Sequence, residues 1–195
     1  MKKVQLFLFA TIVTIFIYSC GGEHDRGSRS TDNPDPGNVD SVGTGQTNNN
    51  NADNADAAFL SDAAYGGMKE VEAGNVAKQK GQSADVKNLA SMMVTDHTAM
   101  NEKIKALAAK KNIQLPEGLR TEDQDMIRNN KKTGAEFDKE YANMMVQDHE
   151  DTIRKFENAA NNANDPEIKA LANEALPKLR HHLEMSKQTK EKVKG

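Results

Sequence analysis

Two stretches of this chain share one phrase: Met92–His97 is Met-Met-Val-Thr-Asp-His, and Met144–His149 is Met-Met-Val-Gln-Asp-His. They are spaced 52 residues apart in a chain of 195 residues that contains only five histidines. A repeated Asp-His pair indicates two helices that present imidazoles toward a common centre. A polar or metal-binding core is therefore the hypothesis to test.

The segment 54–195 has almost no strand signal, because Ala, Lys, Glu, Met and Leu dominate it and Gly and Pro cluster at breaks. Its hydrophobic periodicity predicts four long helices, near 56–80, 83–112, 135–161 and 165–193. Short connections favour antiparallel neighbours. The expected fold is therefore all-α: an up-down four-helix bundle with a short extra helix between the second and third long helices.

Capping residues predict where these helices begin. Ser83 is a candidate N-cap, and Asp165 is another because a proline follows it at the first helical position. Thr121 and Gln124 have capping-box spacing and predict the start of the short helix. Gly134 is expected to close that helix.

Three of the long helices each place one histidine on the face expected to be buried: His97, His149 and His182. His181 is rotated by about 100° from its neighbour and is expected to face solvent or the rim of the bundle. The first long helix has no histidine, but Glu70 has only small residues at three and four positions away, so a close helix approach buries it. Four helices then supply one carboxylate and three imidazoles.

This set, Glu70, His97, His149 and His182, suits a single Zn, Fe, Mn or Cu ion. Asp96, Asp148 and Glu72 are candidates for holding the ligands in place from behind. Met93, Met100 and Met145 near the histidines are either soft ligands for Cu(I) or core filler. The alternative for the whole set is a structural polar layer, in which buried His, Asp and Glu side chains hydrogen-bond to one another without a metal.

The amino terminus has the order of a secretory signal: a cationic start, an apolar run over residues 4–17 that is too short to span a bilayer, and then small residues. Cys20, the only cysteine, lies where a lipoprotein signal places its acylated residue. We expect a signal peptide at 1–19 and a disordered tether at 20–53, which is rich in Gly, Ser, Asn and Asp. The expected location is the cell envelope, with an outer-membrane lipid anchor and the domain facing the periplasm.

Several phrases of the chain resemble the DUF4142 family of exported bacterial proteins, often labelled "predicted outer membrane protein" and regarded as ferritin-like in fold. The resemblance covers nearly all of residues 56–186 and implies a ferritin-like bundle and an envelope location. It implies no reaction. The phrases that carry it are Phe59-Leu60, Gly66–Glu72, Asp85–Lys87, Met93–His97, Leu115-Pro116, Gly134–Asp138, His149-Glu150 and Leu176–Leu183.

Other function classes are disfavoured. Di-iron ferritin-like enzymes need Glu-x-x-His on two helices, whereas Val94, Val146 and Leu179 stand three residues before the histidines. Without residues 1–19 the chain has 24 basic and 29 acidic side chains and no basic block with aromatics, which argues against nucleic acid. The expected function is a non-catalytic, lipid-anchored bundle that binds one metal ion, or a structural or interaction module as the alternative.

Overall fold

The computed structural model of the protein describes residues 49–194, and the regular structure in this part is entirely helical. The predicted signal peptide, Cys20 and most of the predicted tether lie outside the described residues. The first helix begins at Asn49, so the last residues of the predicted tether already belong to it. The helices are α1 (Asn49–Lys80), α2 (Ala84–Lys110), α3 (Thr121–Arg128), α4 (Gly134–Asn162) and α5 (Pro166–Lys192).

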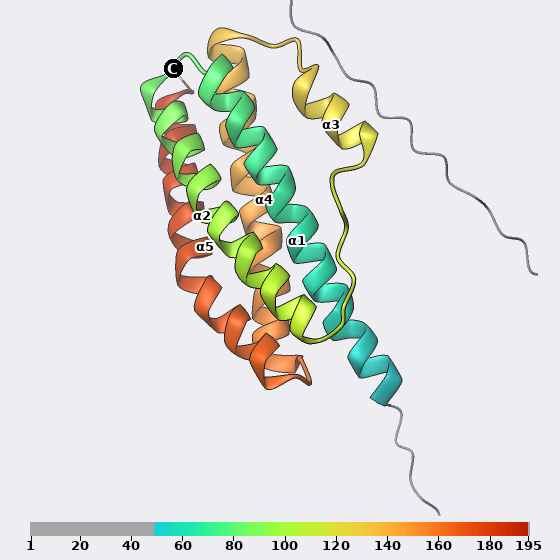
Figure 1. The fold of residues 1–195 in the computed structure, drawn as a ribbon. Coiled ribbons are helices and arrows are strands. Elements are labelled where there is room, and N and C mark those ends of the chain that lie inside the picture. Colours follow the sequence, from blue (N-terminus) through green and yellow to red (C-terminus); the bar gives the residue numbers. More distant parts are fainter. Residues whose placement is uncertain (1–48, 195) are drawn as a thin grey trace, which may run out of the picture. The chain divides into compact units, whose positions relative to one another are not determined.

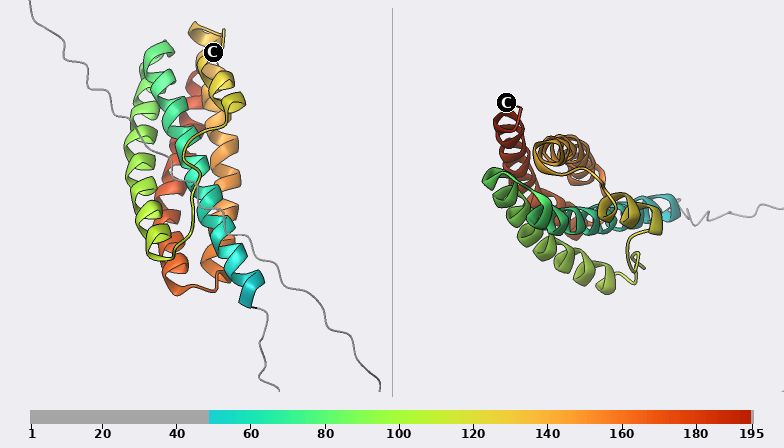
Figure 2. Two further views of the ribbon diagram at one scale, coloured as in Figure 1. Left: turned by 45° about the vertical axis from the view of Figure 1, so that its right-hand side comes forward. Right: turned by 90° about the horizontal axis from the view of Figure 1, so that it is seen from above.

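Four long helices form the bundle as two antiparallel hairpins, α1 with α2 and α4 with α5 (Figure 1). The connection from α2 to α4 is long. It runs back along the outside of α1, carries α3, and lets α2 and α4 run in the same direction (Figures 1 and 2). Strict up-down alternation, expected from short connections, is therefore broken at this one crossover. One long crossover is the arrangement of ferritin-like bundles.

Two of the three predicted helix starts are confirmed. The Ser83 side chain accepts a hydrogen bond from the backbone N–H of Asp85 at 3.1 Å, and the Asp165 side chain accepts from Glu167 and Ile168 at 2.8 and 3.2 Å. These side chains satisfy N–H groups that have no partner within the helix.

The predicted short helix is present, but the residues that begin and end it differ from the predicted ones. Thr121 is its first helical residue, and the N-cap is Arg120, which makes no side-chain capping bond. Gln124 donates instead to the carbonyl oxygen of Leu119 at 2.8 Å, outside the helix. Gly134 opens α4 with a positive φ of 60°, a backbone conformation that glycine adopts without strain.

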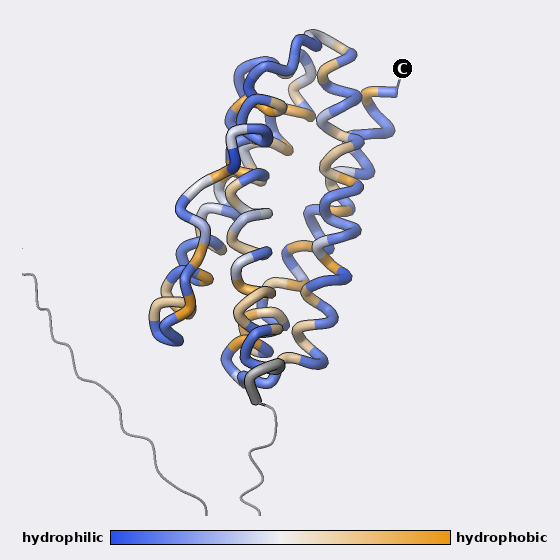
Figure 3. The backbone as a smooth tube through the Cα atoms, turned by 90° about the vertical axis from the view of Figure 1, so that its right-hand side faces the viewer, coloured by the Kyte–Doolittle hydropathy of each residue, from blue (hydrophilic) through white to orange (hydrophobic). Residues whose placement is uncertain are grey.

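The bundle core consists of apolar clusters on either side of a polar level. Hydrophobic and hydrophilic residues alternate along each helix (Figure 3), which buries one stripe per helix. Toward the α1–α2 turn the core includes Ala77, Leu89, Met93, Tyr141 and Met145. Toward the α4–α5 turn it includes Leu60, Ile104, Phe156, Ile168 and Leu176. Among the described residues, no helix has the apolar length needed to cross a membrane.

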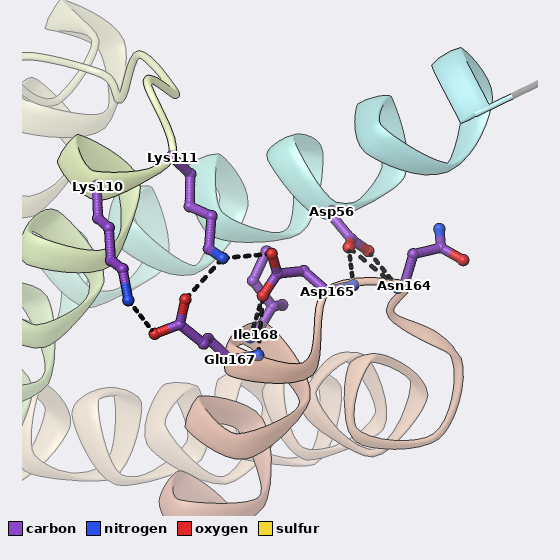
Figure 4. A network of polar contacts seen from close by, with 7 residues as sticks. All are labelled: Asp56, Lys110, Lys111, Asn164, Asp165, Glu167 and Ile168. Atoms are coloured by element: carbon purple, nitrogen blue, oxygen red, sulfur yellow. Dashed lines mark hydrogen bonds and ion pairs between the residues drawn. The ribbon is translucent and has the colours of Figure 1, made fainter.

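A buried carboxylate from one hairpin holds the turn of the other at each end of the bundle. Asp138 of α4 accepts the backbone N–H groups of Gln82 and Ser83 at 3.0 and 2.7 Å. Asp56 of α1 accepts those of Asn164 and Asp165 at 3.0 and 2.8 Å (Figure 4). Each carboxylate therefore satisfies N–H groups at a helix start that the helix itself leaves without partners.

The lysines at the end of α2 reinforce the α4–α5 turn. Lys110 contacts Glu167 at 2.5 Å, and Lys111 bridges Asp165 and Glu167 (Figure 4). This network joins the two hairpins at the end of the bundle where α2 ends and α5 begins.

Candidate metal centre

The polar level of the core is built by three buried histidines, one from each of α2, α4 and α5. Their exposed fractions are 5% for His97, 0% for His149 and 1% for His182. His181, one position before the last of these, is exposed, as the helical rotation predicts. The buried stripe of each helix therefore selects one imidazole and directs it inward.

One nitrogen of each ring faces the other two rings. The Nε2 atoms of His97 and His149 are 3.4 Å apart, and His149 Nε2 lies 3.3 Å from Nδ1 of His182. The three inner nitrogens all lie within 4.8 Å of one another. Ring centroids 5.1 to 5.4 Å apart form a nearly equilateral triangle.

The outer nitrogen of each ring lies against an acceptor. His97 Nδ1 is 2.9 Å from Glu70 Oε2, His149 Nδ1 is 2.9 Å from the carbonyl oxygen of Met145, and His182 Nε2 is 2.8 Å from Asp96 Oδ2. A carbonyl or an ionised carboxylate only accepts hydrogen bonds. Each outer nitrogen therefore carries the hydrogen, which leaves a lone pair on each inner nitrogen of a neutral ring.

The two carboxyl groups that accept these bonds are ionised. Burial raises the pKa of the Glu70 carboxyl, but the attraction of His97 in its charged form and its hydrogen bond outweigh burial and bring that pKa below its usual value. Burial also opposes ionisation of Asp96, yet hydrogen bonds from Lys178 and His182 lower its pKa overall. Both acceptors are thus carboxylates at neutral pH.

Burial acts on the imidazoles in the opposite sense, because it disfavours their charged form. It lowers the pKa of His149 and, with repulsion from His97 and His149, lowers the pKa of His182 to about 4 despite its bond to Asp96. These two rings are therefore neutral at pH 7, which is the form that binds a metal.

The spacing of the inner nitrogens fits a transition-metal ion. Zn–N bonds of about 2.0–2.1 Å in tetrahedral geometry place neighbouring nitrogens roughly 3.3 Å apart. Two of the three separations, 3.4 and 3.3 Å, match that edge, and the third is within 4.8 Å. Three imidazoles whose inner nitrogens converge in this way are therefore a candidate ligand set for a single ion.

The chain was compared with known proteins. The model of a family described as "Domain of unknown function (DUF4142)" matches residues 42–189. The chain belongs to this family. The resemblance seen in its motifs is thereby confirmed, and none of the curated proteins compared with the chain matches it.

Among solved structures, this DUF4142 chain is similar to a conserved hypothetical protein, Rv2844, from Mycobacterium tuberculosis. The two share 14% sequence identity at a TM-score of 0.58, over 71% of this chain and 92% of that chain. At this identity the likeness shows the fold alone.

Glu70 lies in a different place from the one predicted for it. The sequence made it a fourth metal ligand, but it contacts His97 on the outer nitrogen, and its other oxygen is 3.6 Å from the outer nitrogen of His149. It thus lies behind two rings, where carboxylates orient metal-binding histidines and strengthen them as ligands. The converging set consists of the three histidines.

The three carboxylates predicted to support the ligands differ in their contacts. Asp96 contacts His182 and is itself held by Lys178 at 2.7 Å. Glu72 accepts a hydrogen bond from Arg128 at 2.6 Å and so attaches α3 to α1. Burial, aided by repulsion from Glu70, raises the pKa of Asp148 to about 6. Within residues 49–194, neither of these last two contacts a histidine of the cluster.

The sequence did not identify the carbonyl oxygen of Met145 or Lys178 as partners of the cluster. A backbone acceptor leaves no trace in residue types, and Lys178 is one of many lysines on helix surfaces. Met93 and Met145 are fully buried within the apolar cluster toward the α1–α2 turn. They serve there as core side chains.

Proposed function

We propose that this protein binds a single transition-metal ion through His97 Nε2, His149 Nε2 and His182 Nδ1. The observation that carries the proposal is the set of contacts of the outer nitrogens: each lies 2.8 or 2.9 Å from an acceptor, so each carries the hydrogen of a neutral ring and three lone pairs converge. Such lone pairs repel one another in a buried site, and a metal cation turns that repulsion into three bonds.

The donor set narrows the choice of metal. Imidazole suits Zn, Cu, Fe and Ni, whereas Mn prefers carboxylate and other oxygen ligands. With Glu70 behind the rings, the three nitrogens favour Zn, Cu or Fe over Mn. A three-histidine set leaves a fourth coordination position for water or another small ligand.

The proposed setting is the cell envelope. The signal-like start and the lone Cys20 support acylation, and a lipid on that residue anchors the domain to the outer membrane through the segment that precedes α1. Replacing Cys20 by Ser is expected to abolish labelling by a fatty-acid probe and to move the protein from membrane to soluble fractions. Unchanged labelling contradicts the anchor.

Metal content tests the central proposal, and the chain supplies a matched pair of variants. Purified protein dialysed against Zn²⁺ is expected to retain one equivalent. His182→Ala should lose it and His181→Ala should keep it, because only the first of these neighbouring histidines faces the cluster. Equal metal in both variants contradicts the proposal.

The second candidate function is a structural polar layer. Its support is that the outer hydrogen bonds of the three histidines need no metal, and one extra proton among the inner nitrogens can link the rings. Thermal unfolding separates the two. If a chelator lowers the melting temperature of the wild type but not that of His182→Ala, the result supports metal binding. If the chelator changes the melting temperature of neither protein, the result supports the polar layer.

A further inference from the structure

The bundle contains a second feature beside the histidines: a cavity of about 270 Å³ lined by residues of α1, α2, α4 and α5. Its volume is close to the lower end of the range of about 300–1,000 Å³ for small-molecule sites. Phe59, Met100, Ile104 and Phe156 form its apolar walls, and Glu70 is among its polar lining residues. The polar lining also includes Asp62, His97, Asn101, Thr152, Lys155 and Asn158. Apolar walls together with convergent polar groups are typical of a ligand site.

Two polar side chains of this cavity each have one oxygen atom without a hydrogen bond. Among the described residues, three buried side-chain atoms have no partner: Glu70 Oε1, Asn101 Oδ1 and Tyr141 Oη. Glu70 and Asn101 both line the cavity. Leaving a buried polar atom unpaired costs about 1–3 kcal/mol, and more for a charged one. Two unpaired acceptors, one on a carboxylate, therefore call for a ligand that donates hydrogen bonds and carries positive charge.

We propose that this cavity binds a small primary ammonium ion with a short apolar tail. The ammonium group donates to Glu70 Oε1 and Asn101 Oδ1, and the tail packs against Phe59 and Phe156, whose rings contact each other edge to face with centroids 5.0 Å apart. An ammonium group has three N–H donors, no acceptor and a positive charge. It therefore complements two acceptor atoms, one of which belongs to a carboxylate.

The absence of a side chain at Gly66 makes room in this cavity. A Cβ atom added there meets nothing within 4 Å, although the residue lines the cavity. At the neighbouring Gly67 an added Cβ would overlap the Asn101 side chain. The first glycine thus leaves open space in the cavity, and the second allows the Asn101 amide to lie against α1.

This inference goes beyond the proposed metal site. The two share Glu70, whose Oε2 holds His97 and whose Oε1 has no hydrogen-bond partner, and His97, which also lines the cavity. The atoms that bind the ammonium in this proposal, Glu70 Oε1 and Asn101 Oδ1, are not among the proposed metal ligands, so ammonium binding needs no metal.

Calorimetric titration of the chelator-treated protein with butylammonium chloride, butan-1-ol and sodium butanoate tests it. We expect saturable one-to-one binding of butylammonium at least tenfold tighter than that of butan-1-ol, which has one donor and no charge. We expect no binding of butanoate, which has no donor and a negative charge, since a site built for a hydrogen-bond donor rejects analogues without it. Equal binding of the ammonium and the alcohol, or no saturable binding, overturns the proposal.

Variants assign the binding to the cavity. Gly66→Leu fills the open space and is expected to abolish butylammonium binding, whereas Gly118→Leu, where an added Cβ also meets nothing, should bind as the wild type does. Glu70→Gln should remove the preference for ammonium over alcohol while circular dichroism shows a folded bundle. Wild-type binding by Gly66→Leu, or an unchanged preference in Glu70→Gln, overturns the proposal.

The outcomes for the two sites are distinguishable. Ammonium binding by a protein that takes up no Zn²⁺ leaves the cavity proposal standing and removes the metal proposal. Zn²⁺ uptake without ammonium binding has the reverse meaning.

Discussion

The middle and the ends of the bundle use the same chemical group in different ways. Asp56 and Asp138 lie buried at opposite ends of the bundle. Both oxygens of each carboxylate accept hydrogen bonds from backbone N–H groups in the turn of the other hairpin. Glu70, at the middle, is equally buried, but one of its oxygens has no hydrogen-bond partner. A carboxylate whose oxygens all accept hydrogen bonds stabilises the fold. A carboxylate with an oxygen that accepts none can still bind a ligand.

The same contrast applies to the donors. The backbone N–H groups at the turns have nothing further to bind once a carboxylate caps them. The three histidines use only their outer nitrogens for the fold, and their inner nitrogens remain as converging lone pairs. The comparison therefore separates groups that assemble the bundle from groups that the assembled bundle offers to a ligand.

The largest expected effect is on stability, when a carboxylate at one end of the bundle is removed. Asp138→Ala leaves the N–H groups of Gln82 and Ser83 unpaired and should lower the free energy of unfolding by about 3 kcal/mol, measured by urea denaturation. Glu136→Ala, two residues away and exposed, is the control and should change it by less than about 0.5 kcal/mol. A loss below about 1 kcal/mol for Asp138→Ala contradicts a structural role for the ends.

The next largest expected effect is on Zn²⁺ affinity, when the carboxylate in the middle of the bundle is changed. Glu70→Gln keeps an acceptor for His97 but removes the charge, so Zn²⁺ affinity should fall by about 10–100-fold, as for other residues that orient metal ligands. The unfolding free energy of the metal-free protein should fall by less than about 1 kcal/mol. Glu72→Gln on the same helix is the control, because that side chain pairs with Arg128. Zn²⁺ titrations that agree for both variants contradict the assigned role of Glu70.

A third comparison uses two glycines of α1. At Gly74 an added Cβ lies 2.7 Å from Val94 Cγ2 and 3.1 Å from the Ala90 carbonyl oxygen, so Gly74→Ala should destabilise by about 1–2 kcal/mol. Gly66→Ala meets open space and should stabilise by about 0.5–1 kcal/mol through helix propensity. Thermal unfolding measures the stability of both variants. A loss of stability in Gly66→Ala contradicts the open space beside Gly66.

The smallest expected effect concerns pH. Burial and Glu70 raise the pKa of Asp148 to about 6 from its ordinary 3.8, so the folded protein binds this proton more tightly than the unfolded chain. The stabilisation is complete below pH 3.8 and is lost as the pH rises through about 6. Asp148→Asn should therefore raise stability by about 1 kcal/mol at pH 7.5 and by less at pH 4.5. An equal gain at both values contradicts this origin.

Hydrophobic periodicity predicted the helices and their buried faces. It did not predict features that depend on contacts between residues far apart in the sequence. The stripes that selected His97, His149 and His182 are properties of single helices, so they were readable before the helices were packed. The crossover between α2 and α4 was not, because a connection of the same length can return to either end of the bundle. Thr121 and Gln124 had capping-box spacing, but the chain starts α3 one residue earlier.

The candidate site shows the same division. Small neighbours predicted the burial of Glu70 correctly but not the side from which it approaches the rings, and that side decides whether it binds a metal or supports a ligand. Asp56 and Asp138 were not noticed, since an aspartate that caps a turn more than 50 residues away looks like any surface acid. The cavity has no local signature either, as its lining comes from four helices.

By itself the sequence determined the helices, the stripe that each buries, and the presence of one imidazole on three of them, because these follow from a period of 3.6 residues and from side-chain chemistry. Only the tertiary structure decided which nitrogen of each ring is free. That choice depends on an acceptor supplied at each outer nitrogen: Glu70 of α1 for His97, Asp96 of α2 for His182, and the carbonyl oxygen of Met145 for His149. Two of the three acceptors come from another helix, so packing was needed to turn three buried histidines into three converging lone pairs.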